Sequence, residues 1–296
     1  MRNDSYYGAK PTIKTAVFRY ITDATALSNA MLSGQIDIMS TVQAPELLGV
    51  FKAKKNLTVY SGSTNCEVTL GMNNARAPFN NKLVRQAVRQ AINKKNLIKT
   101  AWSGYGLEIG SFVPPTDPWY EDLSTLYPYD VNKSKALLKS AGYANGLTIN
   151  LDLPPIAYAT NSGEFIAASL AKVGIKVNLK PIAWGEWIDR VFTKKDYDMT
   201  IVCHIESNDM AIYANPAYYF GYNSTTYQGL IKKAASAKTQ EARVENLKKA
   251  ARLLANDSVS DWLWLIPNLQ VAKKTISGIP LNTVGDAYTV DRITVG

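Results

Sequence analysis

The chain has 296 residues, of which 46% are hydrophobic, so it can bury one large core or two ordinary cores and is too apolar to be disordered. Its formal net charge is +9, but the basic residues form separated pairs such as Lys94-Lys95 and Lys232-Lys233. Such pairs are typical of solvated helix ends, so we expect no nucleic-acid partner. No apolar run approaches the length of a membrane span.

The two cysteines are Cys66 and Cys203. Two cysteines are too few for a disulfide framework, and this pair lacks the spacing of metal ligands. We therefore expect both to be small buried residues.

The first part of the chain is predicted to form an α/β unit. A strand is expected over 13–19, and Thr22 or Asp23 can then cap a helix that ends at Ser33-Gly34. Further short elements are expected as strands over 36–39, 57–61 and 67–72 and as a helix over 45–51.

Another helix is expected after Pro78. Apolar residues recur there three and four positions apart, at Val84, Ala87, Val88, Ala91 and Ile92. This spacing predicts one buried face, with Arg85, Arg89 and Gln90 facing water. Asn80 and Asn81 can cap the start of this helix, and another helix is expected over 93–102.

The later part of the chain alternates strands and helices. After an irregular segment over 110–129 that is rich in proline and aromatic residues, Asn132 is expected to cap a helix. Strands over 147–153, 175–182 and 197–203 alternate with helices over 163–172 and 186–193, and helices over 227–237 and 239–255 lead to a buried strand over 261–266. Strands that are separated by helices pair in parallel, so the carboxyl ends of the first three strands should share one edge of a sheet.

Ligands of open α/β sheets bind outside the carboxyl ends of the strands. The loops at that edge bring together Tyr158, Trp184, His204, Glu206 and Asp209. Aromatic walls and a few carboxylates suit an extended ligand that carries an amino group.

Each candidate also has a structural interpretation. His204 could be a hydrogen-bonded residue of the scaffold, Glu206 and Asp209 could be solvated loop acids, and Trp184 could pack in the core beside Trp187. His204, Glu206 and Asp209 could together bind a metal, but the chain offers no second histidine and no usable cysteine pair, so we expect no metal site.

Several motifs resemble those of a known family, the extracellular solute-binding proteins of family five, which are peptide and nickel receptors of bacterial ABC importers. The resemblance rests on Asn73, Pro78-Phe79, Val84-Arg85, Ala87 and Ala91-Ile92-Asn93-Lys94. Similar motifs occur at 3–11, 34–37, 129–138 and 141–143. It implies an α/β, periplasmic-binding-protein-like (type II) fold, with two lobes of mixed sheets joined by hinge crossings near Gly71 and Leu265. Residues 1–70 and 265–296 would form an incomplete first lobe and residues 71–264 the second α/β lobe.

The resemblance also implies a function. It predicts the substrate-binding component of an ABC importer, which captures oligopeptides or a related small solute in an interlobe cleft and delivers it to a membrane permease. Asn73 and Tyr218 join the ligand-binding candidates. Many relatives carry W-x-x-D followed by D-P, where the acid receives the terminal amine of the peptide. The corresponding residues here are His204-Ile205-Glu206-Ser207 and Asn215-Pro216. Glu206 or Asp209 would therefore take over that electrostatic role.

Other implications concern compartment and completeness. Members of the family are exported, so we expect a periplasmic protein or a lipoprotein anchored at the outer face of the cell membrane, with its export signal outside this chain. Because the family is usually longer, an N-terminal segment of the same protein is expected to precede Asn3.

Two alternative functions stay open. One is a hydrolase that uses Glu206 and Asp209 as an acid/base pair, and the other is a peptide-binding chaperone. The sequence contains no nucleophile elbow, no HExxH motif and no Gly-rich phosphate loop, so we predict a binding protein and not an enzyme, with no cofactor.

Overall fold

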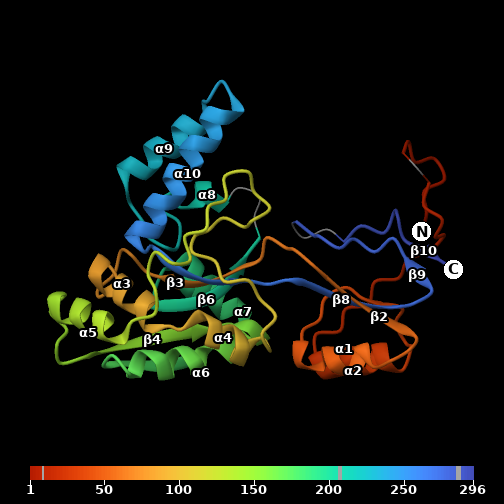
Figure 1. Cartoon of the computed structure of the whole chain (residues 1–296), viewed down its shortest axis with the longest axis horizontal. Helices are drawn as coiled ribbons and strands as arrows, with labels where there is room; N and C mark the ends of the chain where they lie inside the picture. Colours follow the sequence, from red (N-terminus) through yellow and green to blue (C-terminus); the bar gives the residue numbers. More distant parts are fainter. Residues whose placement is uncertain (9, 206–208, 285–287) are drawn as a thin grey trace. The chain divides into compact units, whose positions relative to one another are not determined.

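The computed structural model describes residues 1–8, 10–205, 209–284 and 288–296. The chain divides into two compact units (Figure 1). Unit 1 consists of Met1–Thr64 and Pro267–Gly296, and unit 2 is the continuous segment Asn65–Ile266. Because these boundaries fall before β3 (Glu67–Met72) and after β7 (Ser260–Leu265), both strands belong entirely to unit 2.

Unit 2 is built on a five-stranded mixed sheet with the strand order β5-β4-β6-β3-β7. Its other three strands are β4 (Leu147–Leu153), β5 (Ile175–Pro181) and β6 (Met199–His204). β4 is parallel to both β5 and β6, which confirms that the carboxyl ends of these strands share one edge. β3 runs antiparallel to β6, so its first residue, Glu67, lies opposite His204 at that same edge.

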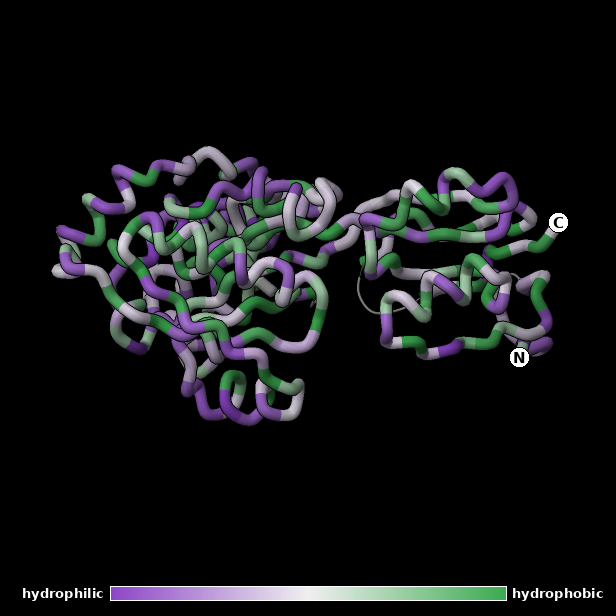
Figure 2. The backbone as a smooth tube through the Cα atoms, turned by 90° about the horizontal axis from the view of Figure 1, so that it is seen from below, coloured by the Kyte–Doolittle hydropathy of each residue, from purple (hydrophilic) through white to green (hydrophobic). Residues whose placement is uncertain are grey.

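Helices cover both faces of this sheet (Figure 1). On one side lie α4 (Lys94–Ala101) and α6 (Ala157–Ala171), and on the other lie α8 (Asp209–Ile212), α9 (Thr225–Ala235) and α10 (Gln240–Asp257). The remaining helices of unit 2 are α3 (Lys82–Ala91), α5 (Val131–Ser140), α7 (Trp184–Glu186) and the π-helical turn η2 (Trp187–Thr193). In Figure 2 hydrophilic segments lie mainly on the outside of unit 2, and hydrophobic segments run through its interior.

Alternation along β6 assigns its side chains to two cores. Met199 and Ile201 belong to one apolar cluster, with Cys203 packed against it, whereas Val202 belongs to a second cluster on the opposite face. His204 follows Val202 by two residues and therefore points to the second face.

The prediction that Arg85, Arg89 and Gln90 face water is wrong. Their exposed fractions are only 6%, 3% and 1%. The Arg85 guanidinium donates hydrogen bonds to the carbonyl oxygens of Asp257 and Ser258, at the carboxyl end of α10. A cation at that position is favoured because the last carbonyl groups of a helix are unsatisfied, so the polar face of α3 is covered by another helix.

Two other predictions about helices need correction. Asp130, and not Asn132, caps α5, because its side chain accepts a hydrogen bond from the Lys133 amide. α6 begins at Ala157, earlier than predicted, so Tyr158 lies in its first turn and not in a loop. Asn81 caps α3, as predicted.

Unit 1 contains a three-stranded antiparallel sheet with the order β1-β8-β2, formed by β1 (Ile38–Met39), β8 (Asn268–Lys273) and β2 (Leu57–Gly62). Beside it are α1 (Ala24–Leu32), the turn η1 (Pro45–Leu47) and α2 (Leu48–Lys52), and β9 (Ile276–Ser277) pairs with β10 (Thr294–Val295).

The predicted strand over 13–19 does not form. Within the described parts of the chain, the backbone of residues 15–21 makes no backbone hydrogen bond, and a strand requires a partner. The side chains of Val17, Phe18 and Tyr20 are 79%, 58% and 94% exposed. We refer to residues 15–21 as the unpaired segment.

Among the helices that the structure describes, none combines the length and the apolar character needed to cross a membrane.

Candidate functional site

His204 ends β6 inside a cluster of aromatic rings. It is 3% exposed, and its Nε2 atom lies 2.8 Å from the hydroxyl oxygen of Tyr219. Its ring centroid lies 5.6 Å from that of Phe112 and 5.5 Å from that of Phe220. The structure therefore places His204 as a buried, hydrogen-bonded member of the cluster.

The rings continue from His204 toward the protein surface. Tyr219 packs edge-on against Trp187, with a centroid distance of 5.6 Å. Trp187 in turn packs edge-on against Trp184 at 5.8 Å, and Trp184 is 39% exposed. This series of rings, which we call the ring series, lies on the face of β6 that carries His204 and reaches the carboxyl-end edge of the sheet through α7.

A second branch of the ring series passes through Tyr218. The Tyr218 ring lies 6.5 Å from His204 and 5.6 Å from Phe192. Tyr218 is half-buried, and Phe192 is 40% exposed. The structure thus brings together Trp184, His204 and Tyr218, and adds Phe192 and Tyr219, which the sequence analysis did not single out.

The tight spacing of Tyr218, Tyr219 and Phe220 was the available sequence signal for this cluster. Three consecutive aromatic residues in a loop that follows a buried strand are unusual for a solvated loop. Tyr219 and Phe220 are each only 1% exposed.

Tyr158 lies on the opposite face of the sheet from His204. Its hydroxyl oxygen accepts a hydrogen bond of 3.0 Å from the backbone N–H of Cys203, and its side chain packs in the other apolar cluster. Burial raises the pKa of Tyr158 to about 12, so the phenol is neutral at physiological pH. Here Tyr158 supports β6 and does not join the ring series.

Asn73 lies at the other end of the sheet. Its preceding residue, Met72, is opposite Met199 in the β3–β6 register, whereas His204 is opposite Glu67. The Asn73 side-chain amide donates hydrogen bonds to the carbonyl oxygens of Lys195 and Tyr197. These bonds fix the turn that precedes β6, and the structure does not bring Asn73 to His204.

The two candidate acids are only partly covered by the structure. Glu206 lies outside the described residues, and Asp209 is described as the first residue of α8. Among the side chains that the structure does describe, no group of three or more His, Cys, Asp or Glu residues could hold a metal ion.

Cys66 and Cys203 form a disulfide bond, so the expectation that they are small buried residues was wrong. Cys66 immediately precedes β3 and Cys203 lies within β6, and the pairing of these two strands brings the Cα atoms to 5.4 Å. The sequence did not reveal this bond because nothing in it indicates that β3 and β6 are neighbours.

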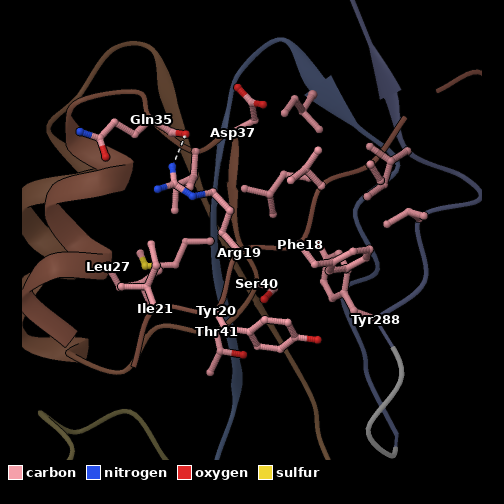
Figure 3. Close-up of a pocket in the computed structure, with 18 of the residues that line it drawn as sticks. Phe18, Arg19, Tyr20, Ile21, Leu27, Gln35, Asp37, Ser40, Thr41 and Tyr288 are labelled. Atoms are coloured by element: carbon pink, nitrogen blue, oxygen red, sulfur yellow. Dashed lines mark hydrogen bonds between the residues drawn. The ribbon is translucent and has the colours of Figure 1, made fainter. Parts of the chain in front are cut away.

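Unit 1 contains a separate cavity of about 500 Å³ (Figure 3). The unpaired segment lines it, together with residues 35–41 and residues near the end of the chain. Figure 3 shows the Arg19 side chain beside Gln35, and its guanidinium donates a hydrogen bond to the Gln35 carbonyl oxygen at 3.4 Å. The walls are mostly apolar side chains, such as Phe18, Ile21 and Leu27, and no candidate from the sequence analysis lies among them.

The comparisons with known proteins assign the family. Residues 1–229 match the family described as "Bacterial extracellular solute-binding proteins, family 5 Middle". The chain therefore belongs to the family 5 extracellular solute-binding proteins, as its motifs predicted.

Individual relatives match nearly the whole chain but are themselves much longer. The chain is 27% identical to the dipeptide-binding protein of Escherichia coli over 303 aligned residues, which cover 97% of this chain and 55% of that protein. It is 26% identical to heme-binding protein A of Haemophilus influenzae, over 86% of this chain and 49% of that protein.

A solved structure confirms the periplasmic-binding-protein-like fold. It is the ABC transporter-associated periplasmic binding protein of Helicobacter pylori in complex with the peptide STSA, with a TM-score of 0.89 and 24% identity. The comparison covers 99% of this chain and 59% of that one. The chain thus spans about half the length of the curated relatives that it matches.

Proposed function

We propose that this chain is the substrate-binding part of a bacterial ABC importer and holds a peptide or a related small solute at the carboxyl-end edge of β4, β5 and β6. The observation that carries the proposal is the ring series, which runs from buried His204 to Trp184 at 39% exposure. Relatives named for binding dipeptides and heme support a role in binding rather than in catalysis.

The ring series suits this role for a physical reason. Trp187 is 7% exposed and its indole N–H donates a 2.9 Å hydrogen bond to the Thr200 hydroxyl, so the ring behind Trp184 is fixed before a ligand arrives. A fixed ring loses little conformational entropy on binding, and exposed rings offer a large apolar contact area. Trp184, Phe192 and Tyr218 are the surfaces that a ligand side chain would contact.

The charged part of the ligand is assigned to the loop after β6. A peptide amino terminus, or another cationic group, pairs with Glu206 or Asp209 in this proposal, and His204 holds the start of that loop through its bond to Tyr219. This assignment rests on the sequence positions of the two acids, because Glu206 and Asp209 are the first acidic residues after the buried end of β6 at His204.

Compartment and partners belong to the same proposal. The family is described as extracellular, and a disulfide bond is typical of proteins that fold outside the reducing cytosol. We place the protein in the periplasm or at the outer face of the membrane, as a soluble or lipid-anchored receptor that delivers its solute to an ABC permease.

A further segment of the same protein is part of the proposal, because the relatives are about twice as long as the matched region. The unpaired segment offers free backbone groups and three exposed apolar side chains, Val17, Phe18 and Tyr20. An added strand pairs readily with such a backbone. We assign the cavity of unit 1 to the docking of that segment and not to the solute.

Native mass spectrometry tests the proposed function. The chain is incubated with an equimolar pool of dipeptides and tripeptides, desalted and sprayed without denaturation. We expect one or a few intact peptides to be retained, and Trp184→Ala to retain less of each. Release of shortened peptides would instead support the hydrolase, and retention of nothing from this pool by a folded chain would contradict a peptide site.

A further inference from the structure

The disulfide lies where the chain enters and leaves unit 2. Cys66 is the second residue of that unit, directly after Asn65. The backbone N–H of Ile266, the last residue of unit 2, donates a 3.0 Å hydrogen bond to the Cys66 carbonyl oxygen. Cys66 therefore contacts both the first and the last residue of unit 2.

The other half of the disulfide lies against the candidate site. Cys203 directly precedes His204, and its backbone N–H donates to the Tyr158 hydroxyl oxygen at 3.0 Å. The Asn65 side-chain amide donates a 2.6 Å hydrogen bond to the Ile205 carbonyl oxygen, one residue beyond His204. The Cys66–Cys203 disulfide thus links the place where the chain enters and leaves unit 2 to the carboxyl end of β6, which carries the candidate site.

We propose that the Cys66–Cys203 disulfide is a positioning device that holds the His204 end of β6 for ligand binding, and that its reduction weakens binding while unit 2 stays folded. The inference rests on the proposed function, because it concerns the same site. Both cysteines are half-buried and not sealed in the core, so a small dithiol can reach the bond.

The chemistry is ordinary thiol–disulfide exchange. A dithiol reductant gives two electrons to the Cys66–Cys203 bond, which yields two cysteine thiols and the disulfide of the reductant. The β3–β6 hydrogen bonds and both apolar clusters are formed by other residue contacts, so we expect unit 2 to keep them after the disulfide is broken. Reduction removes only the covalent link between the start of β3 and the end of β6, so we expect the structural change to be confined to these two strand ends.

Hydrogen exchange separates a local role from a general one. The oxidised chain is compared with the dithiothreitol-treated chain and with the double variant Cys66→Ser, Cys203→Ser. We expect amide protection at 65–67 and 203–205 to fall by about tenfold or more, and protection of β4 to stay unchanged. Reoxidation of the treated wild-type chain should restore protection, whereas the double variant should not respond to oxidant.

Binding completes the test. With the same peptide pool, the oxidised chain should retain peptide about tenfold better than the reduced chain or the double variant. Equal retention by oxidised and reduced protein, or a uniform loss of protection across β4 and β6, would overturn the inference. If even the oxidised chain retains no peptide, the proposed function fails, and the exchange experiment still decides whether the disulfide holds the end of β6.

Discussion

At the scale of single residues, the buried charges of α3 and α4 show what periodicity could not predict. Asp261 is fully buried, with one carboxylate oxygen 2.8 Å from the Lys94 ammonium and 3.3 Å from Nε of Arg89. Burial lowers the pKa of both cations, while the Asp261 charge raises it. The sequence pattern identified the apolar face of α3, but it contained no information on what covers the polar face.

This ion cluster makes a prediction about stability. Asp261→Asn leaves two buried cations without their counter-charge and should lower the free energy of unfolding by about 3 to 5 kcal/mol in urea titrations. The matched control is Asp189→Asn, whose carboxylate pairs with Lys194 at 2.6 Å but is 60% exposed. That exposed pair should contribute about 0 to 1 kcal/mol, so equal losses for the two variants would contradict the assignment.

Tyr158 makes a prediction about pH. Its pKa is raised from 10.0 to about 12 by burial, so the folded state keeps a proton that the unfolded state loses. The corresponding stability is present below pH 10 and is lost as the pH rises from about 10 to about 12, by about 3 kcal/mol at most.

The check is urea unfolding at pH 8 and pH 11.5 of wild type and Tyr158→Phe. The variant lacks the hydroxyl that accepts from Cys203, so it should be less stable at pH 8. The advantage of the wild type should shrink at the higher pH. An advantage that is independent of pH would show that Tyr158 titrates normally.

At the scale of elements, the sequence predicted that strands β4, β5 and β6 share one edge because helices separate the predicted strands there. It also predicted the edge at which Trp184 and His204 lie. It could not predict that β3 inserts between β6 and β7, because antiparallel pairing between distant segments has no local signal. Because the pairing of β3 with β6 was not predicted, the Cys66–Cys203 disulfide was not predicted either.

The start of α6 explains why the candidate site was only partly predicted. No side chain caps this helix, so nothing in the sequence separated its first turn from the preceding loop. Tyr158 was therefore placed in a ligand loop, and the structure places it behind β6. Asn73 was chosen from its family motif, which did not reveal at which end of the strand it lies.

α7 provides a test of the proposed ligand surface. Trp184→Ala removes the exposed end of the ring series and should weaken binding of the retained peptide by about tenfold in calorimetry, with little change in melting temperature. Trp187→Ala is the matched control, because this ring is buried and bonds to Thr200. It should cost about 3 to 5 kcal/mol of stability. Unchanged affinity in a well-folded Trp184→Ala protein would remove Trp184 from the site.

At the scale of the whole molecule, the two units differ in how completely their backbones are paired. Unit 2 holds a five-stranded sheet between two apolar clusters, whereas unit 1 has a three-stranded sheet and the unpaired segment. An exposed, unpaired backbone is open to proteases and to pairing with other strands.

Limited trypsin digestion should reflect this difference. We expect early cleavage after Arg19, in the unpaired segment, and slow cleavage after the basic residues between Leu147 and His204. Mass spectrometry of the digest over time identifies the order of cuts. If the first cut falls between Leu147 and His204, the unpaired segment of unit 1 is not the most accessible backbone and this prediction is wrong.

We propose that the solute binds at the carboxyl-end edge of unit 2 and not in the cavity of unit 1. Hydrogen exchange of the oxidised chain, with and without a saturating amount of the retained peptide, tests it most directly. With the solute at that edge, we expect added protection in 183–193 and 203–220 and no change in the unpaired segment. Protection confined to residues 15–21 and 35–41 would contradict it and would assign the solute to the cavity of unit 1.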